Sequence, residues 1–374
     1  MNLPAAKILL IIIFLSVASQ SVKAQAPTPT PIQTDDTEKV FTEEIKLNVS
    51  AVDRRGKFFA GVNKEDLVIM EDGRLHQADS LRRIPANVLI VMDTGGEMRQ
   101  AKGFEQTKKT AENLIAALLP EDSVAIMQYH DKAEIIAEWT TDKTEALRIL
   151  KTKANFGKRS LFFGALETAT KFLQKSALDN RHLVLISDGT DTFNDKTQRD
   201  AAMQNLLATD VNVHVISYTQ LERADIEPRT KGISSSPMPK AMPREVAAQM
   251  PNGVRDMAIT ANILTINTDR AFLRKMRERK QELINGEKYL ATLSRDTNGE
   301  FILPESKEEM LDKSALIARI IDSSYVITYT PKRALSESET GEVRIIEVSS
   351  RRPNLQVQAR RKLVVNGFNS GKRF

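Results

Sequence analysis

The sequence contains no cysteine among its 374 residues. Disulfides therefore cannot stabilise the protein, and lipid modification of an N-terminal cysteine is excluded. Beyond residue 18 no apolar run is long enough to cross a bilayer, which takes about 20 residues. An excess of one charge is also lacking, because 54 Lys and Arg stand against 49 Asp and Glu. This balance does not favour a nucleic-acid partner.

The first residues have the pattern of a secretory signal. Lys7 precedes the apolar segment 8–18, and Val22 and Ala24 occupy the small-residue positions of a cleavage site. We therefore expect residues 1–24 to be removed and the protein to be secreted or periplasmic, in a bacterial envelope, with no stable membrane span after cleavage. A retained anchor is the alternative. Residues 25–39 are rich in Pro, Thr and Asp and are expected to form a disordered linker.

Two segments have the pattern of antiparallel strands. In the segment 40–84, Ile45, Leu47 and Val49 alternate with polar residues, and Glu71-Asp72-Gly73 is typical of a hairpin turn. In the segment 323–366, the runs "YVITYTP", "EVRIIEVSS" and "LQVQARRKLVV" follow one another without a helix. We predict that the two segments pair into one small β-sandwich.

Between them, residues 85–322 alternate strands with helices, which predicts an α/β fold with a doubly wound, mostly parallel, Rossmann-like sheet. The stretch 219–287 interrupts this alternation and is interpreted as an insertion. A charged helix near 269–294 places Met276, Leu283 and Leu290 seven residues apart. We interpret these as a packing face opposite a solvated charged side, with a coiled-coil contact as the alternative.

One strand of this domain ends in the sequence "LIVMDTGGEM", where Asp93 precedes two glycines. The carboxylate could belong to an aspartic protease, to an ion-binding turn, or to a strand that runs out into a loop. In a sheet of order 3-2-1-4-5-6, the strand order reverses between the first and fourth strands, and ligands bind at that point. Asp93 ends the first strand and Asp188 follows the fourth. The two carboxylates are therefore expected at the same edge.

The sequence lacks the partners that enzymatic chemistry requires. An aspartic protease needs a second Asp-Thr/Ser-Gly in an all-β setting, and a phosphotransferase needs an Asp-x-Asp or a Gly-rich phosphate loop. Neither occurs with the right context. The four histidines lack the spacing of zinc ligands. We predict a protein that is not an enzyme, with an aspartate-dependent hydrolase as a remote alternative.

These residues resemble the von Willebrand factor type A domain and, more narrowly, bacterial exported proteins called VWFA-related. The family's adhesion site uses an Asp-x-Ser-x-Ser turn, a later Thr, and an Asp after the fourth strand. The turn resembles Asp93-Thr94-Gly95-Gly96-Glu97, the Thr position matches Ser160 of "GKRSLFFGAL", and the last Asp matches Asp188. The segments "GVNKEDLVIMEDG", "LSRDTNGEFILPES" and "SSYVITYTP" extend the resemblance over most of residues 41–365 outside 219–287.

The resemblance implies a degenerate metal-ion-dependent adhesion site made of Asp93, Glu97, Ser160 and Asp188. Such a site would bind Mg²⁺ or Mn²⁺, which take about six oxygen ligands. Gly95 and Glu97 replace the two serines of the family turn, so one hydroxyl is missing and one ligand is longer and charged. In the alternative, the site holds no metal and Lys158 and Arg159 neutralise it.

We therefore expect an exported, non-enzymatic module that uses this face for adhesion or for binding a protein ligand of unknown identity. The alternative is a structural assembly module with a vestigial, metal-free site. In that case the sandwich and the 219–287 insertion would make the contacts.

Overall fold

The computed structural model describes residues 43–96, 101–176, 178–237 and 262–365. The predicted signal, the predicted linker and Glu97 lie outside these ranges. Within the described residues, no helix combines the length and the apolar character needed to cross a membrane.

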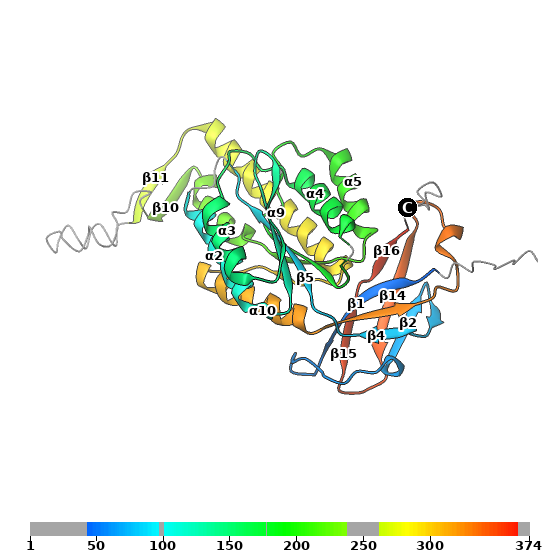
Figure 1. The fold of residues 1–374 in the computed structure, drawn as a ribbon. Coiled ribbons are helices and arrows are strands. Elements are labelled where there is room, and N and C mark those ends of the chain that lie inside the picture. The colour runs from blue at the N-terminus through cyan, green and yellow to red at the C-terminus, as the bar shows by residue number, and fades with distance from the viewer. Residues whose placement is uncertain (1–42, 97–100, 177, 238–261, 366–374) are drawn as a thin grey trace, which may run out of the picture. The chain divides into compact units, whose positions relative to one another are not determined.

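The centre of the fold is a sheet of six strands (Figure 1). All neighbouring strands are parallel except the edge pair β6 and β7, which is antiparallel. The strand order β12-β9-β8-β5-β6-β7 is the doubly wound order expected from the sequence. In chain order the strands are β5 (Asn87–Asp93), β6 (Ser123–Tyr129), β7 (Ala133–Thr140), β8 (Arg181–Ile186), β9 (Asn212–Ile216) and β12 (Phe301–Ile302).

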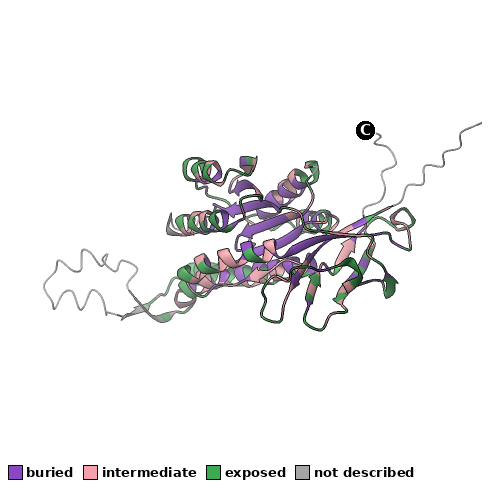
Figure 2. Cartoon of the chain, turned by 60° about the horizontal axis from the view of Figure 1, so that its bottom comes forward, coloured by how far each residue is buried: buried purple, intermediate pink, exposed green. Residues whose placement is uncertain are grey.

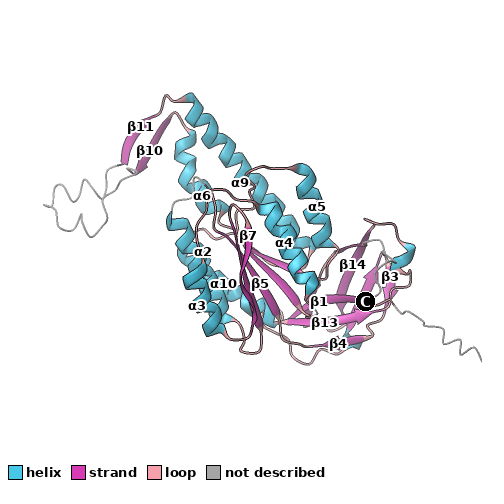
Figure 3. Cartoon of the chain, turned by 45° about the horizontal axis from the view of Figure 1, so that its top comes forward, coloured by secondary structure: helices cyan, strands magenta, loops and turns pink. Residues whose placement is uncertain are grey.

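Helices cover both faces of this sheet because successive strand residues point to opposite sides (Figure 3). In β5, Val88 and Ile90 belong to one apolar core and Leu89 and Val91 to the other. The first core is shared with α2 (Ala101–Ala117), α3 (Lys143–Lys153) and α10 (Lys307–Asp322). The second core is shared with α4 (Phe162–Lys175), α5 (Lys196–Leu207) and α9 (Arg270–Asp296).

Side chains fix where several helices begin. Asp142, Asp195 and Asp269 each accept two backbone N–H groups at the starts of α3, α5 and α9, and Ser306 accepts one at the start of α10. Such caps satisfy amide groups that have no partner within the helix. The helix boundaries thus follow from local sequence as well as from packing.

The terminal segments form two antiparallel sheets, of order β15-β1-β13-β4 and β16-β14-β2-β3. Their inner faces share one apolar core that includes Leu47, Ile69, Ile327 and Ile346. This confirms the predicted sandwich, which draws on both ends of the described chain. Its elements are β1 (Ile45–Val52), η1 (Lys64–Asp66), β2 (Leu67–Glu71), β3 (Arg74–His76), β4 (Ser80–Arg82), β13 (Ser324–Tyr329), η3 (Leu335–Glu337), β14 (Val343–Ser350), β15 (Gln356–Ala359) and β16 (Lys362–Val364).

The sandwich also contains a buried ion pair. Arg344 is fully buried, and its Nη1 lies 2.7 Å from Glu71 Oε1. The Nη1 group also donates to the Arg333 carbonyl, and Nη2 donates to the Ala334 carbonyl and the Ser338 hydroxyl. A charge in an apolar interior is tolerated only when it is paired in this way. In Figure 2 the strands are the most buried elements of the chain.

The described part of the stretch 219–287 is more regular than its sequence pattern suggested. It forms α6 (Thr219–Ile226), η2 (Glu227–Thr230) and a hairpin of β10 (Ile233–Pro237) with β11 (Asn262–Ile266). A helix of eight residues has too little intrinsic stability to form alone. Helix α6 is held by its contacts with α9, which no local pattern reveals.

Two histidines pack together inside the main domain. His182 of β8 and His214 of β9 are both 1% exposed, and their rings stack with 5.3 Å between centroids. The Glu300 N–H donates to His214 Nδ1 at 3.2 Å, so His214 Nε2 carries the proton and donates to His182 Nδ1 at 3.1 Å. Burial lowers the pKa of His214 to about 4, and burial together with His214 lowers the pKa of His182 well below its usual range.

This pair predicts a loss of stability in acid. Between the ordinary histidine pKa of about 6.5 and pH 4, the unfolded chain binds protons that the native state does not. The free energy of unfolding should therefore fall by about 1.4 kcal/mol per pH unit for each histidine as the pH drops through this window. Denaturant titrations between pH 7 and pH 5 measure this slope. The double variant His182→Leu/His214→Leu should flatten it, and an unchanged slope would contradict the assignment.

Candidate functional site

The carboxyl edge of the sheet holds the candidate site. Asp93 is the last residue of β5, and Asp188 follows β8 by two residues. These two strands are neighbours, and the chain leaves them toward opposite sides of the sheet. The two residues are 1% and 2% exposed, respectively. Both predicted carboxylates thus lie at the same edge, but beneath the surface.

Among the described residues, donors from three segments of the chain surround Asp93. The Gly95 N–H donates to Oδ1 at 3.0 Å, and the Tyr218 hydroxyl donates to Oδ2 at 2.7 Å. Ser160 Oγ lies 3.3 Å from Oδ2 and 3.4 Å from the Thr190 carbonyl, so its single proton serves one of the two at a time. The structure therefore brings Ser160 to Asp93, as the sequence predicted. Tyr218, which follows β9, was not predicted.

Asp188 is bound from two directions. Oδ1 accepts the N–H and the hydroxyl of Thr190, at 2.9 and 2.8 Å. Oδ2 accepts Arg279 Nη2 at 2.7 Å. Arg279 lies in the middle of α9, far from Asp188 in sequence. The carboxylate is thus paired with a cation that the chain itself supplies.

Arg279 joins several groups at once. Besides Asp188, it donates from Nη1 to the Thr190 hydroxyl at 2.9 Å and from Nη2 to Glu222 of α6 at 2.9 Å. Its side chain is 20% exposed. Burial opposes the charge, but Asp188 and Glu222 outweigh it and raise the pKa of Arg279 above its ordinary value. The guanidinium is therefore permanently charged in this position.

Two glycines let α9 approach closely enough for this contact. A Cβ on Gly286 would lie 2.4 Å from the Asp188 carbonyl, and one on Gly189 would lie 2.7 Å from Leu290. Gly189 also has φ +69°, which favours glycine. Gly286 is seven residues after Arg279 and so lies on the same helix face. This glycine within the charged helix is the one sequence signal that could have pointed to Arg279.

The loop that carries Ser160 is fixed by Asp131. Arg159 Nε donates to Asp131 Oδ1 at 2.8 Å, and the backbone N–H groups of Lys158 and Arg159 donate to the same carboxylate. The Arg159 guanidinium holds the pKa of Asp131 below its usual value. The alternative in which Arg159 neutralises Asp93 and Asp188 is therefore corrected, because Arg159 pairs with Asp131 and Arg279 pairs with Asp188.

The described residues do not form an evident divalent-cation site. Within the described ranges, no group of three or more His, Asp or Glu residues is arranged to hold a metal. Gly95 offers no side-chain oxygen. A Cβ there would lie 1.8 Å from the Arg159 carbonyl oxygen, so the position has no room for one. The described residues around Asp93 and Asp188, which do not include Glu97, therefore fit the metal poorly.

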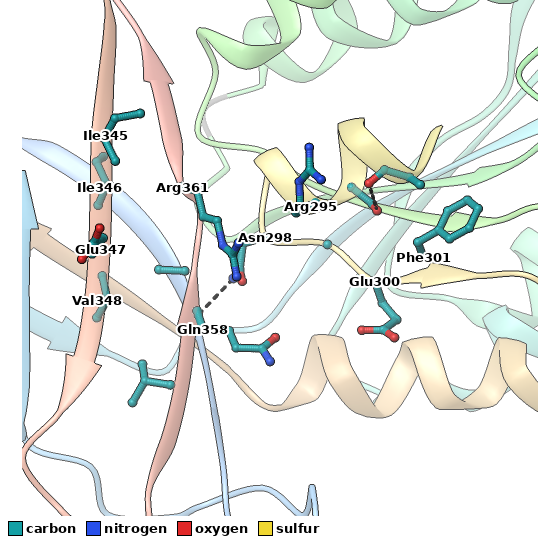
Figure 4. A pocket seen from close by; sticks show the side chains of 15 residues that line it. Arg295, Asn298, Glu300, Phe301, Ile345, Ile346, Glu347, Val348, Gln358 and Arg361 are labelled. Atoms are coloured by element: carbon teal, nitrogen blue, oxygen red, sulfur yellow. Dashed lines mark hydrogen bonds between the residues drawn. The ribbon is translucent and has the colours of Figure 1, made fainter. Parts of the chain in front are cut away.

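A separate hollow of about 610 Å³ lies where the end of α9 and the following loop face strands β14 and β15 (Figure 4). Asn298 Nδ2 donates to the Gln358 carbonyl across it, at 3.1 Å. Arg295, Glu300 and Arg361 also line it. Burial raises the pKa of Glu300. None of the residues predicted from the sequence lies in this hollow.

The tight packing of Gly95 gives a direct test of the site. Gly95→Ser should lower the free energy of unfolding by at least about 3 kcal/mol, because backbone atoms of Arg159 and His130 meet the new side chain and cannot move away cheaply. Gly164→Ala is the control, since the nearest atom to its Cβ would be Gln198 Nε2 at 3.7 Å. Thermal unfolding of both variants measures the difference. A Gly95→Ser protein as stable as the wild type would contradict the geometry.

Part of the α/β domain is similar in sequence to a known family. Residues 88–190 match the family model of the von Willebrand factor type A domain. No curated protein sequence matches the chain.

Several solved structures resemble the chain at low sequence identity. An aerotolerance-related membrane protein from Bacteroides fragilis is 16% identical, covering 63% of this chain and 98% of that one, with a TM-score of 0.36. A von Willebrand factor type A protein from Catenulispora acidiphila is 9% identical, with coverages of 89% and 76% and a TM-score of 0.39. The manganese-loaded TRAP protein of Plasmodium vivax is 10% identical, with coverages of 85% and 97% and a TM-score of 0.36.

The family model matches residues 88–190, and the doubly wound sheet order continues through β9 and β12 beyond them. The protein therefore carries a von Willebrand factor type A domain.

Proposed function

We propose that the protein is an exported, non-enzymatic interaction module that binds a protein ligand at the carboxyl edge of its central sheet. The observation that carries this proposal is the pair of fixed loops at that edge, 156–160 and 188–194. Glycines and carboxylates hold both loops in place, and both present side chains to solvent. A binding surface profits from such order, because little conformational freedom is lost when the partner docks.

The exposed side chains on these loops suit a protein partner. Phe193 is 63% exposed and Phe156 is 44% exposed. The Arg159 guanidinium lies 5.9 Å from the centre of the Phe193 ring. Aromatic and arginine side chains are the residues that contribute most at protein interfaces. Single exposed apolar residues are common, but here each of the two loops carries an exposed phenylalanine.

A small hollow opens beside the loop 188–194. It measures about 190 Å³ and is lined by Thr190, Asn194, Arg199, Tyr289 and others. The Tyr289 hydroxyl is buried and finds no hydrogen-bond partner within the described residues. Burial raises the pKa of this hydroxyl, so it stays protonated and can donate. A partner's side chain would find both apolar walls and polar groups here.

Burial of the carboxylates argues against an enzyme. Aspartate-dependent hydrolysis needs a carboxylate that touches the substrate. Asp93 and Asp188 are nearly inaccessible and are bound by donors from the chain. Export is supported by the sequence pattern of residues 1–24.

A second candidate function is structural assembly through the insertion. Ile233 and Ile266 are directly opposite each other in the β10–β11 hairpin and are 62% and 66% exposed. Two-stranded hairpins are only marginally stable alone, so a partner that covered these residues would stabilise them. In this case the hairpin, and not the loops at the sheet edge, would make the contact.

Capture experiments with the purified chain as bait and an envelope fraction as prey separate the two functions. Phe193→Asp should reduce the retained partner at least about tenfold, because it places a charge in an aromatic contact. Leu178→Asp is the matched control. It changes a residue of similar character, 37% exposed, just before β8 at the opposite edge of the sheet. Loss of capture with Ile266→Asp but not with Phe193→Asp would favour structural assembly and refute the loop surface.

A further inference from the structure

We propose that Arg279 takes the place of the divalent cation in this adhesion site. The chain thereby neutralises Asp188 itself, and the site neither needs nor takes up Mg²⁺ or Mn²⁺. The proposal concerns the internal chemistry of the site and does not depend on the identity or existence of a partner.

The buried Asp188 carboxylate needs a counter-charge. The Asp188 side chain is 3% exposed, and an ionised carboxylate at such depth must be paired or must take up a proton. Arg279 supplies the pairing in a forked geometry, with Nη2 on Asp188 Oδ2 and Nη1 on the Thr190 hydroxyl. Thr190 in turn donates to Asp188 Oδ1. Carboxylate, hydroxyl and guanidinium therefore form a closed ring of hydrogen bonds.

The ring of hydrogen bonds among Asp188, Thr190 and Arg279 excludes a metal ion. A divalent cation needs direct contact with carboxylate oxygens and several further oxygens around it. Asp188 Oδ2 already contacts a fixed positive charge, which would repel the incoming ion. Gly95 adds no oxygen and has no space for a side chain. An ion would have to displace Arg279 from Asp188 and from Glu222 at the same time.

Contacts along α9 hold Arg279 in place. Met276 and Leu283, the buried residues three before and four after it, lie on the same side of the helix. Gly286 brings the helix backbone against the loop of Asp188. Two further ion pairs fasten α9 to the insertion, Lys280 to Glu227 of η2 and Arg223 of α6 to Glu287. A helix held at several points positions its arginine without relying on a flexible loop.

Thermal unfolding of the purified full chain tests the proposal. The wild type should show the same Tm with and without millimolar MnCl₂, and Mn²⁺ added to the protein should keep the electron paramagnetic resonance signal of the free ion. Arg279→Ala should lower the Tm by about 5 °C or more, because it leaves Asp188 buried without its cation. Arg274→Ala is the control on the same helix, since Arg274 is 77% exposed in its pair with Glu278.

A double variant distinguishes an arginine that neutralises Asp188 from one that only contributes to packing. The quantity compared is the change in Tm. In the background of Asp188→Asn, which removes the charge to be neutralised, Arg279→Ala should lower the Tm by less than half as much as it does in the wild type. Arg279→Lys should recover part of the loss because it keeps the charge but not the fork. If Arg279→Ala does not fold, the comparison of Arg279→Lys with and without Asp188→Asn carries the same test.

Two results would overturn the proposal. One is a Tm of the wild type that rises with MnCl₂ and no longer does so in Asp188→Asn. The other is an Arg279→Ala protein that melts like Arg274→Ala.

Discussion

The ion pair between Asp188 and Arg279 is the contact on which the functional edge of the domain depends. It joins the end of β8 to the middle of α9 and, through Glu222, to α6. Without a cation at this place, a carboxylate would be buried next to Glu222 with no compensating charge. The loop from 188 to 194 starts at this ion pair, and Ser160 and Thr192 connect it to the neighbouring loop.

Much of the fold was predictable because it rests on local patterns. Alternating apolar residues in β1 and continuous apolar strands such as β5 and β8 mark half-buried and fully buried strands, and the structure confirms the sheet order and the shared sandwich. The site was predictable only in part. Asp93 ends β5, Ser160 shortly precedes α4 and Asp188 follows β8, so topology places them. Arg279 and Tyr218 reach the site through tertiary packing, and apart from Gly286 the charged helix carries no local sign of the partner of Arg279.

Three buried polar pairs of the described residues share one feature, which is that both members come from the chain itself. Arg344 with Glu71, His182 with His214, and Arg279 with Asp188 each connect segments that are distant in sequence. Such pairs add less stability than apolar packing of the same volume would, but they tolerate few alternative partners. In a chain without disulfides, they fix which segments meet while the apolar cores supply the driving force.

The sandwich has a consequence for the order of folding. Strand β1 pairs with β13, and the Ser50 hydroxyl lies 3.2 Å from the hydroxyl of Ser323, 273 positions later in the chain. During synthesis, the first strands are complete long before their partners exist, while the whole α/β domain lies between them and can fold as a unit. Contacts of such high sequence separation form slowly. The earliest part of the folded chain to be made is thus the last to be completed, and until then its strand edges are open to other chains.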